Sequence, residues 1–423
     1  MKERIAIVGT GVAGLGCAWQ LRKLADITLI EREPRPGGHS NTVEVEEGGK
    51  QIRIDTGFIV FNQPNYPHLV RLFEELGVET KPSEMSFSVQ HLPEQLEYNG
   101  MGANKVFAQR RNLVRPRFYR LLFQILRFFK LAHEALADPA TRDLTVREFT
   151  ERHGLGKDFL DFYLVPMSSA VWSTDPVRML DFPAHSLLRF FQNHGFLGVT
   201  THHPWFTVTG GAKSYVDKIL EAVRPVRLPA KVIAVTESPD HVTIRTADGH
   251  VEDFDRVVIA SHADEALEML TDPDPTQKRL LSAFGYQRNT VSLHTDESVM
   301  PVHRRTWASW NYRIDRNAEG KVRATTHYWM NSLQGVSNKK NYFVSLNSSS
   351  FLPTEKVLYT TDYDHPVYTL EAMRAQDELP SLNTRSPRQR IFFCGSYFRY
   401  GFHEDAYASA VNLSALLRVF LKS

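Results

Sequence analysis

The sequence predicts an α/β fold in which distant parts of the chain build one parallel sheet, joined to a discontinuous α+β domain. Three observations support this expectation. Residues 5–8 form an apolar run that leads through glycines into a helical pattern, and residues 391–394 do the same near the other end of the chain. Between them, residues 230–260 alternate apolar and polar side chains and end in another apolar run. Apolar strands that alternate with helices are typical of parallel sheets.

The first strand is followed by the pattern G-x-G-x-x-G, which is typical of a turn that binds a dinucleotide. Gly9 allows the tight bend, Gly11 lets backbone N–H groups approach a pyrophosphate, and Gly14 lets the helix pack against the strand. Val12 and Ala13 open this helix, and its N-terminus carries partial positive charge toward the phosphates. We therefore expect a Rossmann-like domain.

The second strand ends at Glu31, twenty residues after Gly11, where a carboxylate can accept hydrogen bonds from both ribose hydroxyls. Arg32 follows directly, and the pair Gly37 and Gly38 begins six residues after the carboxylate. A simple NAD-binding turn needs no second glycine pair. An extended FAD does, because the chain must pass close to it before turning inward. The expected cofactor is therefore FAD.

The residues after position 391 form a strand, a glycine turn and a helix with an acidic first turn. The N-terminus of such a helix can direct backbone N–H groups at the pyrimidine edge of a flavin, where negative charge collects on reduction. The alternative is an ordinary terminal helix capped by its own acidic residues. The remaining expected cofactor contacts are His39, Ser40, Thr42, Thr56, Gly57, Val232, Gly395, Ser396, Phe402, Glu404, Asp405 and Ala406.

These elements predict two domains, each assembled from separate pieces. The FAD-binding domain is expected to comprise residues 1–80, 205–270 and 385–423. It includes a β-meander that is broken at Ser-Pro and Asp-Gly turns. Residues 81–204 and 271–384 are expected to form the substrate domain.

Composition limits the function classes without deciding among them. The chain has 423 residues, 42% of them hydrophobic, which is enough for two domains. The net charge of +2 argues neither for nor against a nucleic-acid partner. No nucleic-acid fold signature accompanies the basic residues, so no such partner is expected. The only cysteines are Cys17 and Cys394, which favours a reducing, cytoplasmic compartment over a disulfide framework. We expect neither a signal peptide nor a spanning helix.

Residues 100–133 are strongly basic and contain no Asp or Glu. One interpretation is a basic amphipathic helix that lies on an anionic membrane surface, at the inner face of the membrane. The other is a core helix with a solvated basic stripe. The basic residues are Lys105, Arg110, Arg111, Arg115, Arg117, Arg120, Arg127 and Lys130. The apolar arc opposite comprises Phe118, Leu121, Leu122, Ile125, Phe128 and Phe129.

Aromatic residues gather in the expected substrate domain and could form the walls of a pocket for a long apolar substrate. Each of them could equally be ordinary core. The expected pocket residues are Trp172, Trp205, Trp310 and Trp329. His403, beside the expected flavin helix, is the first choice for an acid/base group, with Tyr328 as the second. His202 and His203 lack ligand spacing, so no metal is expected.

Several segments together resemble a known family, and they span nearly the whole chain. They include "GVAGLGCAW", "GGHSNTV", "DTGFIVFN", "YLVPMSSAVWS", "PWFTVTGG", "WASWNY" and "FCGSYFRYGFHEDA". The sequence resembles the FAD-dependent amine-oxidase-like flavoproteins related to protoporphyrinogen oxidase and phytoene desaturase. More narrowly, it is similar to the branch fused to the front of plant cyclopropane-fatty-acid synthases. The resemblance implies an FAD domain of the glutathione-reductase-2 type and a partner that methylates acyl chains.

The resemblance also implies a function. A flavin-dependent oxidoreductase would act on a lipophilic small molecule or a phospholipid, by dehydrogenating its acyl chain or by moving a double bond. The alternatives are an amine oxidase, with an aromatic cage and an acidic residue for the cation, and an FAD-holding partner subunit without its own turnover. Gly395-Ser396 departs from the Gly-Asp of many relatives, and "WASWNYRI" and "THYWMNS" lack the lysine usual in amine oxidases.

Overall fold

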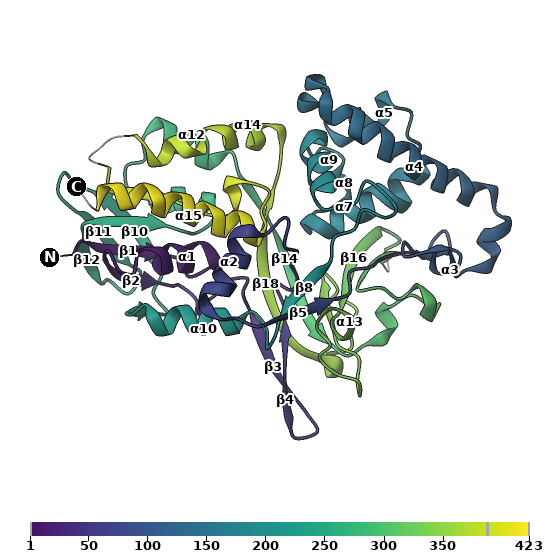
Figure 1. The fold of residues 1–423 in the computed structure, drawn as a ribbon, viewed down its shortest axis with the longest axis horizontal. Helices are drawn as coiled ribbons and strands as arrows, with labels where there is room; N and C mark the ends of the chain where they lie inside the picture. Colours follow the sequence, from purple (N-terminus) through teal and green to yellow (C-terminus); the bar gives the residue numbers. More distant parts are fainter. Residues whose placement is uncertain (1, 318, 386–388, 422–423) are drawn as a thin grey trace.

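The computed structural model describes residues 2–317, 319–385 and 389–421. The chain forms two lobes (Figure 1). One lobe holds the parallel sheet and both ends of the chain, and the other holds a helical region above a large sheet. None of the described helices is long and apolar enough to cross a bilayer.

The parallel sheet combines strands from three distant parts of the chain, in the order β19-β13-β1-β2-β9. Ile5 of β1 pairs with Ile27 on one side and with Arg256 on the other, and Val257 pairs with Ile391. The predicted α/β fold, with a late strand returning to the first nucleotide-binding unit, is confirmed. The strands are β1 (Arg4–Val8), β2 (Asp26–Ile30), β9 (Val226–Arg227), β13 (Arg256–Ile259) and β19 (Ile391–Phe393).

The predicted β-meander is present as a three-stranded antiparallel sheet that immediately precedes β13 in the chain. Its strands are β10 (Val232–Glu237), β11 (Val242–Thr246) and β12 (Val251–Phe254). Two further strand pairs are antiparallel: β3 (Thr42–Glu47) with β4 (Lys50–Asp55), and β5 (Thr80–Ser83) with β8 (Trp205–Val208).

The helices around the parallel sheet come from all parts of the chain. Figure 1 places α12 and α14 beside α15, although both lie within residues 271–384, which were assigned to the substrate domain. Arg279 of α12 and Glu378 of α14 form an exposed ion pair at 2.6 Å, so the two helices lie side by side. The helices are α1 (Val12–Leu21), α2 (Pro67–Leu76), α10 (Lys213–Ala222), α11 (Ala263–Met269), α12 (Pro275–Ser282), α14 (Leu370–Glu378) and α15 (His403–Phe420).

The second lobe contains a seven-stranded sheet in the order β18-β14-β17-β16-β15-β6-β7, with the short helix α13 (Met330–Gln334) after β16. Neighbouring strands are antiparallel except for β15 and β6. The strands are β6 (Phe87–His91), β7 (Leu96–Asn99), β14 (Gly285–His294), β15 (Trp310–Arg316), β16 (Val322–Trp329), β17 (Phe343–Leu346) and β18 (Val357–Val367).

A helical region covers one side of this lobe, with α4 along its outer edge (Figure 1). Phe128, Phe159 and Phe191 are fully buried at its centre, where their rings pack against one another. The helices are α3 (Ala103–Val106), α4 (Pro116–Ala137), α5 (Val146–Arg152), α6 (Lys157–Phe159), α7 (Val165–Trp172), α8 (Pro176–Met179) and α9 (Ala184–Asn193).

A buried carboxylate, that of Asp55, joins the two lobes. At the end of β4 it accepts hydrogen bonds from the backbone N–H of Ala212 at 2.9 Å and from Nε2 of Gln334 at 2.6 Å. The Thr42 hydroxyl donates a third bond, and the Asp55 backbone N–H donates to Oε1 of Gln334. Burial raises the pKa of Asp55 to about 6. Three segments that are far apart in the sequence therefore meet at one side chain.

Close packing of α1 against α15 yields the first testable prediction. A Cβ atom added at Gly16 would lie 2.7 Å from the Tyr407 ring and 3.1 Å from the Ala410 Cβ. Gly16→Val should therefore lower the free energy of unfolding by about 1–3 kcal/mol through overpacking. Urea denaturation of the FAD-loaded protein measures this change. The control is Gly285→Ala, where an added Cβ meets nothing within 4 Å, and an equal loss in both variants would contradict the packing argument.

Candidate active site

A cavity of about 1340 Å³ connects the glycine turn of the parallel sheet with the helical region of the other lobe. Most of the expected cofactor residues line it. They are Gly9, Gly11, Val12, Ala13, Glu31, Arg32, Gly38, His39, Thr56, Gly57, Val232, Gly395, Ser396, Phe402 and Ala406. Gly14, Gly37, Ser40 and Thr42 are not among the lining residues, and the Thr42 hydroxyl donates to Asp55 instead. An added Cβ at Gly14 would lie 1.9 Å from the Gly9 carbonyl oxygen, which fits its predicted packing role.

The glycine turn forms a cradle that fits the pyrophosphate of FAD. Gly9 has a φ of +99°, which the tight bend requires. An added Cβ at Gly11 meets no atom within 4 Å, so the space in front of this residue is open. Gly38 closes the other side, because its own Cβ would lie 3.2 Å from the Gly11 Cα. The second glycine pair thus lets the chain approach the first, as FAD binding predicts.

The Glu31 carboxylate is held in place at the nucleotide end of the cavity. It accepts hydrogen bonds at 2.9 Å from the backbone N–H groups of Thr10 and Glu33. Arg32 forms an ion pair with Glu265, and both residues line the cavity. These contacts fix the Glu31 carboxylate where a ribose could donate hydrogen bonds to it.

His39 lines the cavity within a cluster of rings that the sequence did not indicate. It stacks on Tyr363, with ring centroids 4.5 Å apart, and meets the edge of His365 at 5.5 Å. Burial lowers the pKa of His39 well below its usual range, and that of His365 to about 4. Both histidines are therefore neutral at physiological pH, and the cluster can shape the cavity without placing positive charge in it.

His403 lies at the start of α15 and is held by three residues. Its Nε2 is 2.7 Å from the Tyr215 hydroxyl and 3.1 Å from the Ser40 hydroxyl, and its ring stacks on Phe58 at 3.9 Å. Burial lowers the pKa of His403 to about 3. A base of such low pKa is poorly matched to proton abstraction at neutral pH. The contacts favour a role in positioning the first turn of α15.

Glu404 and Asp405, the acidic pair in the first turn of α15, do not line the cavity, although both were expected to contact the cofactor. Glu404 accepts hydrogen bonds from the backbone N–H groups of His68 and Leu69, both at 3.0 Å, and so caps α2. Asp405 accepts the backbone N–H of Phe402 at 3.0 Å and caps its own helix. The capping alternative thus describes Asp405, whereas Glu404 caps a different helix. Phe402, His403 and Ala406 present the first turn to the cavity.

Three of the four expected tryptophans line the cavity, and one does not. Trp172, Trp205 and Trp310 are in its wall, as is Tyr328, which meets Trp310 edge-on at 4.9 Å. Trp329 points away, because successive residues of β16 face opposite sides of the sheet. Its ring packs against Trp307, and its Nε1 donates to Asn341 at 2.8 Å. Burial raises the pKa of Tyr328, which keeps its phenol protonated.

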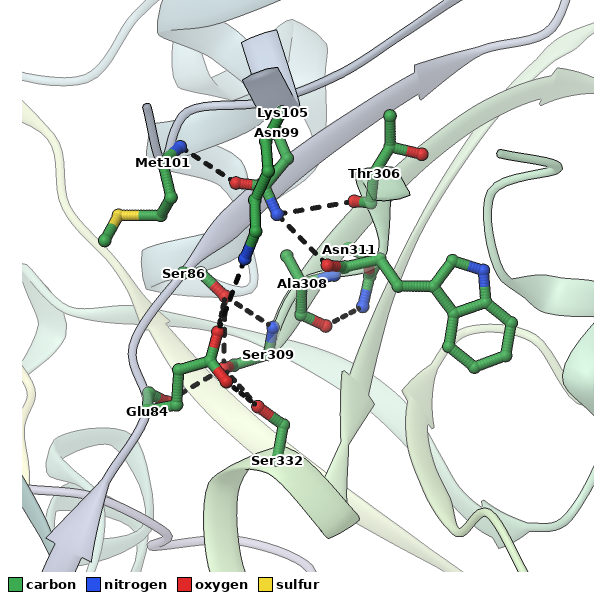
Figure 2. A network of polar contacts seen from close by, with 11 residues as sticks. Glu84, Ser86, Asn99, Met101, Lys105, Thr306, Ala308, Ser309, Asn311 and Ser332 are labelled. Carbon is green, nitrogen blue, oxygen red and sulfur yellow. Dashed lines mark hydrogen bonds and ion pairs between the residues drawn. The ribbon is translucent and has the colours of Figure 1, made fainter. Parts of the chain in front are cut away.

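A polar network behind the wall holds the turn that precedes Trp310 (Figure 2). Glu84 accepts from Ser86 at 3.0 Å and from Ser332 at 2.9 Å, and its backbone oxygen accepts from Ser309 at 2.8 Å. Lys105 of α3 reaches the same carboxylate at 4.0 Å. The network therefore connects β15, α13 and α3, and it fixes the strand from which Trp310 enters the cavity.

Several residues that line the cavity or lie directly behind its wall were not predicted from the sequence, and Tyr215 is of the second kind. Phe58 and Tyr215 hold His403, and Tyr363 and His365 pack around His39. The spacing of Tyr363 and His365 on β18 does predict a shared face, but nothing in the sequence predicts which histidine they meet. The described residues contain no group of three or more His, Cys, Asp or Glu side chains arranged to hold a metal ion.

The fold and the cavity together define a flavin-dependent oxidoreductase whose cofactor is FAD. The model of the flavin containing amine oxidoreductase family matches residues 12–417, and the chain belongs to this family. The predicted family is thereby confirmed, while the narrower branch stays a prediction. Among curated proteins, no sequence matches this chain.

Solved structures share the fold at low sequence identity. Wild-type putrescine oxidase bound to putrescine is 15% identical, with 99% of each chain covered and a TM-score of 0.69. The CLA-producing fatty acid isomerase from P. acnes is 16% identical, with 99% of this chain and 98% of that chain covered and a TM-score of 0.67. A putative protoporphyrinogen oxidase from Exiguobacterium sp. 255-15 is 15% identical over 100% of both chains, with a TM-score of 0.66.

The open space at Gly11 yields a second prediction. Gly11 has φ −61° and ψ 175°, which any residue can adopt, so Gly11→Val should fold normally but fill the cradle. We expect FAD affinity to fall at least about tenfold, which corresponds to ~1.4 kcal/mol. Flavin absorbance per mole of purified protein measures the loss, and circular dichroism checks the fold. A variant that retains a full complement of FAD would show that the cradle lies elsewhere.

A third prediction concerns Asp405, whose pKa burial raises from 3.8 to about 7. The folded state therefore binds this proton more tightly than the unfolded state. Its contribution to the free energy of unfolding is complete below pH ~4 and is lost as pH rises through about 7. Asp405→Asn keeps an oxygen acceptor for Phe402 but cannot ionise. Relative to this variant, the wild type should lose on the order of 2–4 kcal/mol between pH 4 and pH 8.

Urea denaturation across this pH range measures the difference between the two proteins. Asp272→Asn is the matched control, because Asp272 is exposed. Parallel pH profiles of the wild type and Asp405→Asn would contradict the assignment.

Proposed function

We propose that this flavin-dependent oxidoreductase acts on the acyl chain of a lipid. The observation that carries the proposal is the chemistry of the cavity wall in the second lobe. Between positions 83 and 205, the described residues that line the cavity include no Asp, Glu, Lys or Arg. Apolar side chains from α4 and α7 dominate this part, among them Leu122, Ile125, Phe129, Met167 and Val171. Such a wall suits a long hydrocarbon chain.

The same wall argues against an amine as substrate. An ammonium group that leaves water for an apolar cavity requires a carboxylate partner, because an unpaired buried charge is costly. The carboxylates that line the cavity lie elsewhere: Glu31, Glu33, Glu265 and Glu268 at the nucleotide end, and Asp362 and Asp364 on β18. Among the lining residues, the one lysine is Lys231, which immediately precedes β10. The lysine usual in amine oxidases has no counterpart in the described wall.

The residues of this chain would hold the acyl chain and exclude water from it. FAD supplies hydride transfer when bound. Trp172 lies where the apolar wall meets the expected cofactor residues, because Phe402 packs against it at 5.9 Å, and Trp310 lines the same cavity. Burial raises the pKa of Tyr328, so its phenol stays protonated and can donate a hydrogen bond. Dehydrogenation and double-bond rearrangement would both use this placement. Dehydrogenation would leave a hydride on the cofactor and release a proton from the substrate, whereas rearrangement would return the hydride to another carbon of the chain.

The resemblance in the sequence adds a partner to the proposal. The similarity to the branch fused to cyclopropane-fatty-acid synthases favours an enzyme that methylates acyl chains as the source of the substrate. The fatty acid isomerase found among similar structures supports a lipid substrate only as an example that this fold accommodates one.

The test of the proposal is anaerobic reduction of the bound flavin. Detergent-dispersed phospholipids with unsaturated, cyclopropane or methyl-branched chains are mixed with the FAD-loaded protein, with a panel of amines in parallel. Bleaching of the flavin's blue absorbance by one lipid class, or formation of a rearranged product under turnover, supports the proposal. Reduction by amines alone would overturn it.

A fourth prediction tests the cavity wall directly. Ile125→Trp places a large ring into the apolar part of the cavity, so turnover of long acyl chains should fall at least about tenfold, or ~1.4 kcal/mol in the activation barrier. FAD content should not change, because Ile125 is remote in the sequence and fold from the cradle. Val177→Trp, at a position that is 68% exposed and outside the cavity, is the matched control. Unchanged turnover in Ile125→Trp would contradict the placement of the chain.

A further inference from the structure

The outer face of α4 and the turn before it carry large apolar side chains in contact with solvent. Phe123 is 67% exposed, Leu126 is 55% exposed and Val114 is 82% exposed. Together with Leu113 and Tyr119 they form a patch, which we call the outer patch. Leu113, Val114, Pro116, Tyr119, Arg120 and Phe123 also line a shallow groove. Contiguous exposed apolar side chains of this kind mark interaction sites.

The outer patch is not the apolar arc that the sequence indicated. Phe118, Leu121 and Phe128 of that arc are buried in the helical core. Leu122, Ile125 and Phe129 line the cavity. The interpretation of α4 as a core helix is thus correct for the arc. The solvent-facing residues are a separate set, and Tyr119, Phe123 and Leu126 recur at the three- and four-residue spacing of one helix face.

Positive charge surrounds the outer patch. Residues 100–133 contain no Asp or Glu. Some of their basic side chains are engaged: Lys105 reaches Glu84 (Figure 2), and Arg117 binds Asp158 at 2.6 Å and Glu94 at 2.7 Å. Arg110, Arg111, Arg115 and Arg120 form no ion pair with any residue that the structure describes. An anionic surface would provide the counter-charge that the chain itself does not.

The cavity reaches the outer patch through Leu126. This side chain is exposed and also belongs to the cavity wall, whereas its neighbours Leu122 and Ile125 face inward. The exposed patch and the apolar wall are therefore two adjoining faces of one helix. A hydrocarbon chain that moves from the patch to the wall stays in contact with apolar side chains throughout.

We propose that the outer patch docks on an anionic phospholipid bilayer, and that the acyl chain enters the cavity from that bilayer beside Leu126. This inference rests on the proposed function, because it assigns the substrate to lipids in a membrane. Phe123, Tyr119 and Val114 enter the interfacial region, and Arg115 and Arg120 contact the headgroups. Association of one amphipathic face with anionic lipid combines apolar burial with electrostatic attraction, so binding should weaken as salt increases.

The fifth prediction is tested by flotation of the FAD-loaded full chain with vesicles. We expect binding to phosphatidylglycerol vesicles at 0.1 M salt and at least about tenfold weaker binding to phosphatidylcholine vesicles. The double variant Tyr119→Ser/Phe123→Ser should lose at least about tenfold in affinity, and Arg115→Glu/Arg120→Glu should lose the salt dependence as well. Val302→Ser is the matched control at an 80% exposed valine outside the patch. Equal binding by the patch variants and the wild type overturns the proposal.

A second readout separates docking from chemistry. Neither Tyr119 nor Phe123 lines the cavity, so their variant should reduce its flavin with detergent-dispersed lipid as the wild type does. When the same lipid is presented in vesicles, flavin reduction in this variant should be at least about tenfold slower than in the wild type. Vesicle binding without reduction by any lipid overturns the proposed function but supports docking. A dimer that the Phe123→Ser change dissociates, measured by light scattering without lipid, assigns the patch to a second copy of the chain and overturns membrane docking.

Discussion

The buried Asp55 carboxylate fixes the relation between the two ends of the cavity. It receives hydrogen bonds from the start of α10, from the β3–β4 hairpin and from α13, and these elements belong to different lobes. Each of these contacts donates to the carboxylate, which partly offsets the cost of burying it. Because the cradle at Gly11 belongs to one lobe and the wall at Trp310 to the other, a shift at this junction would change the distance over which a substrate carbon must reach the cofactor.

The two ends of the cavity differ in polarity. Charged residues gather where a nucleotide would lie, and the part formed by α4 and α7 is apolar. Histidines at the junction, His39, His365 and His403, are all held neutral by burial. Such an environment stabilises neither a substrate cation nor a proton acceptor, and it suits reactions in which positioning and exclusion of water provide most of the catalysis.

Local patterns in the sequence predicted the parts of the fold that depend on near neighbours. The glycine turn at Gly9, the carboxylate at Glu31 and the β-meander are of this kind, because their geometry follows from adjacent residues. Contacts between distant segments were not predictable. Tyr215 is 188 positions from His403, and Glu404 caps a helix 336 positions away. Strand periodicity separates Tyr328 from Trp329, but it does not say which of them faces the cavity.

The return of the chain to its first sheet has a consequence for biosynthesis. Strand β19 and helix α15 complete the sheet and the cofactor end of the cavity, and both come from the segment after residue 390. During translation, β1 and α1 leave the ribosome long before the partners that cover them. The nascent N-terminal unit therefore exposes apolar surface until β19 and α15 have been synthesised and have packed against it. The complete cofactor end of the cavity, which includes Gly395 and Phe402 as well as Gly11, can therefore form only after this late segment has joined the sheet.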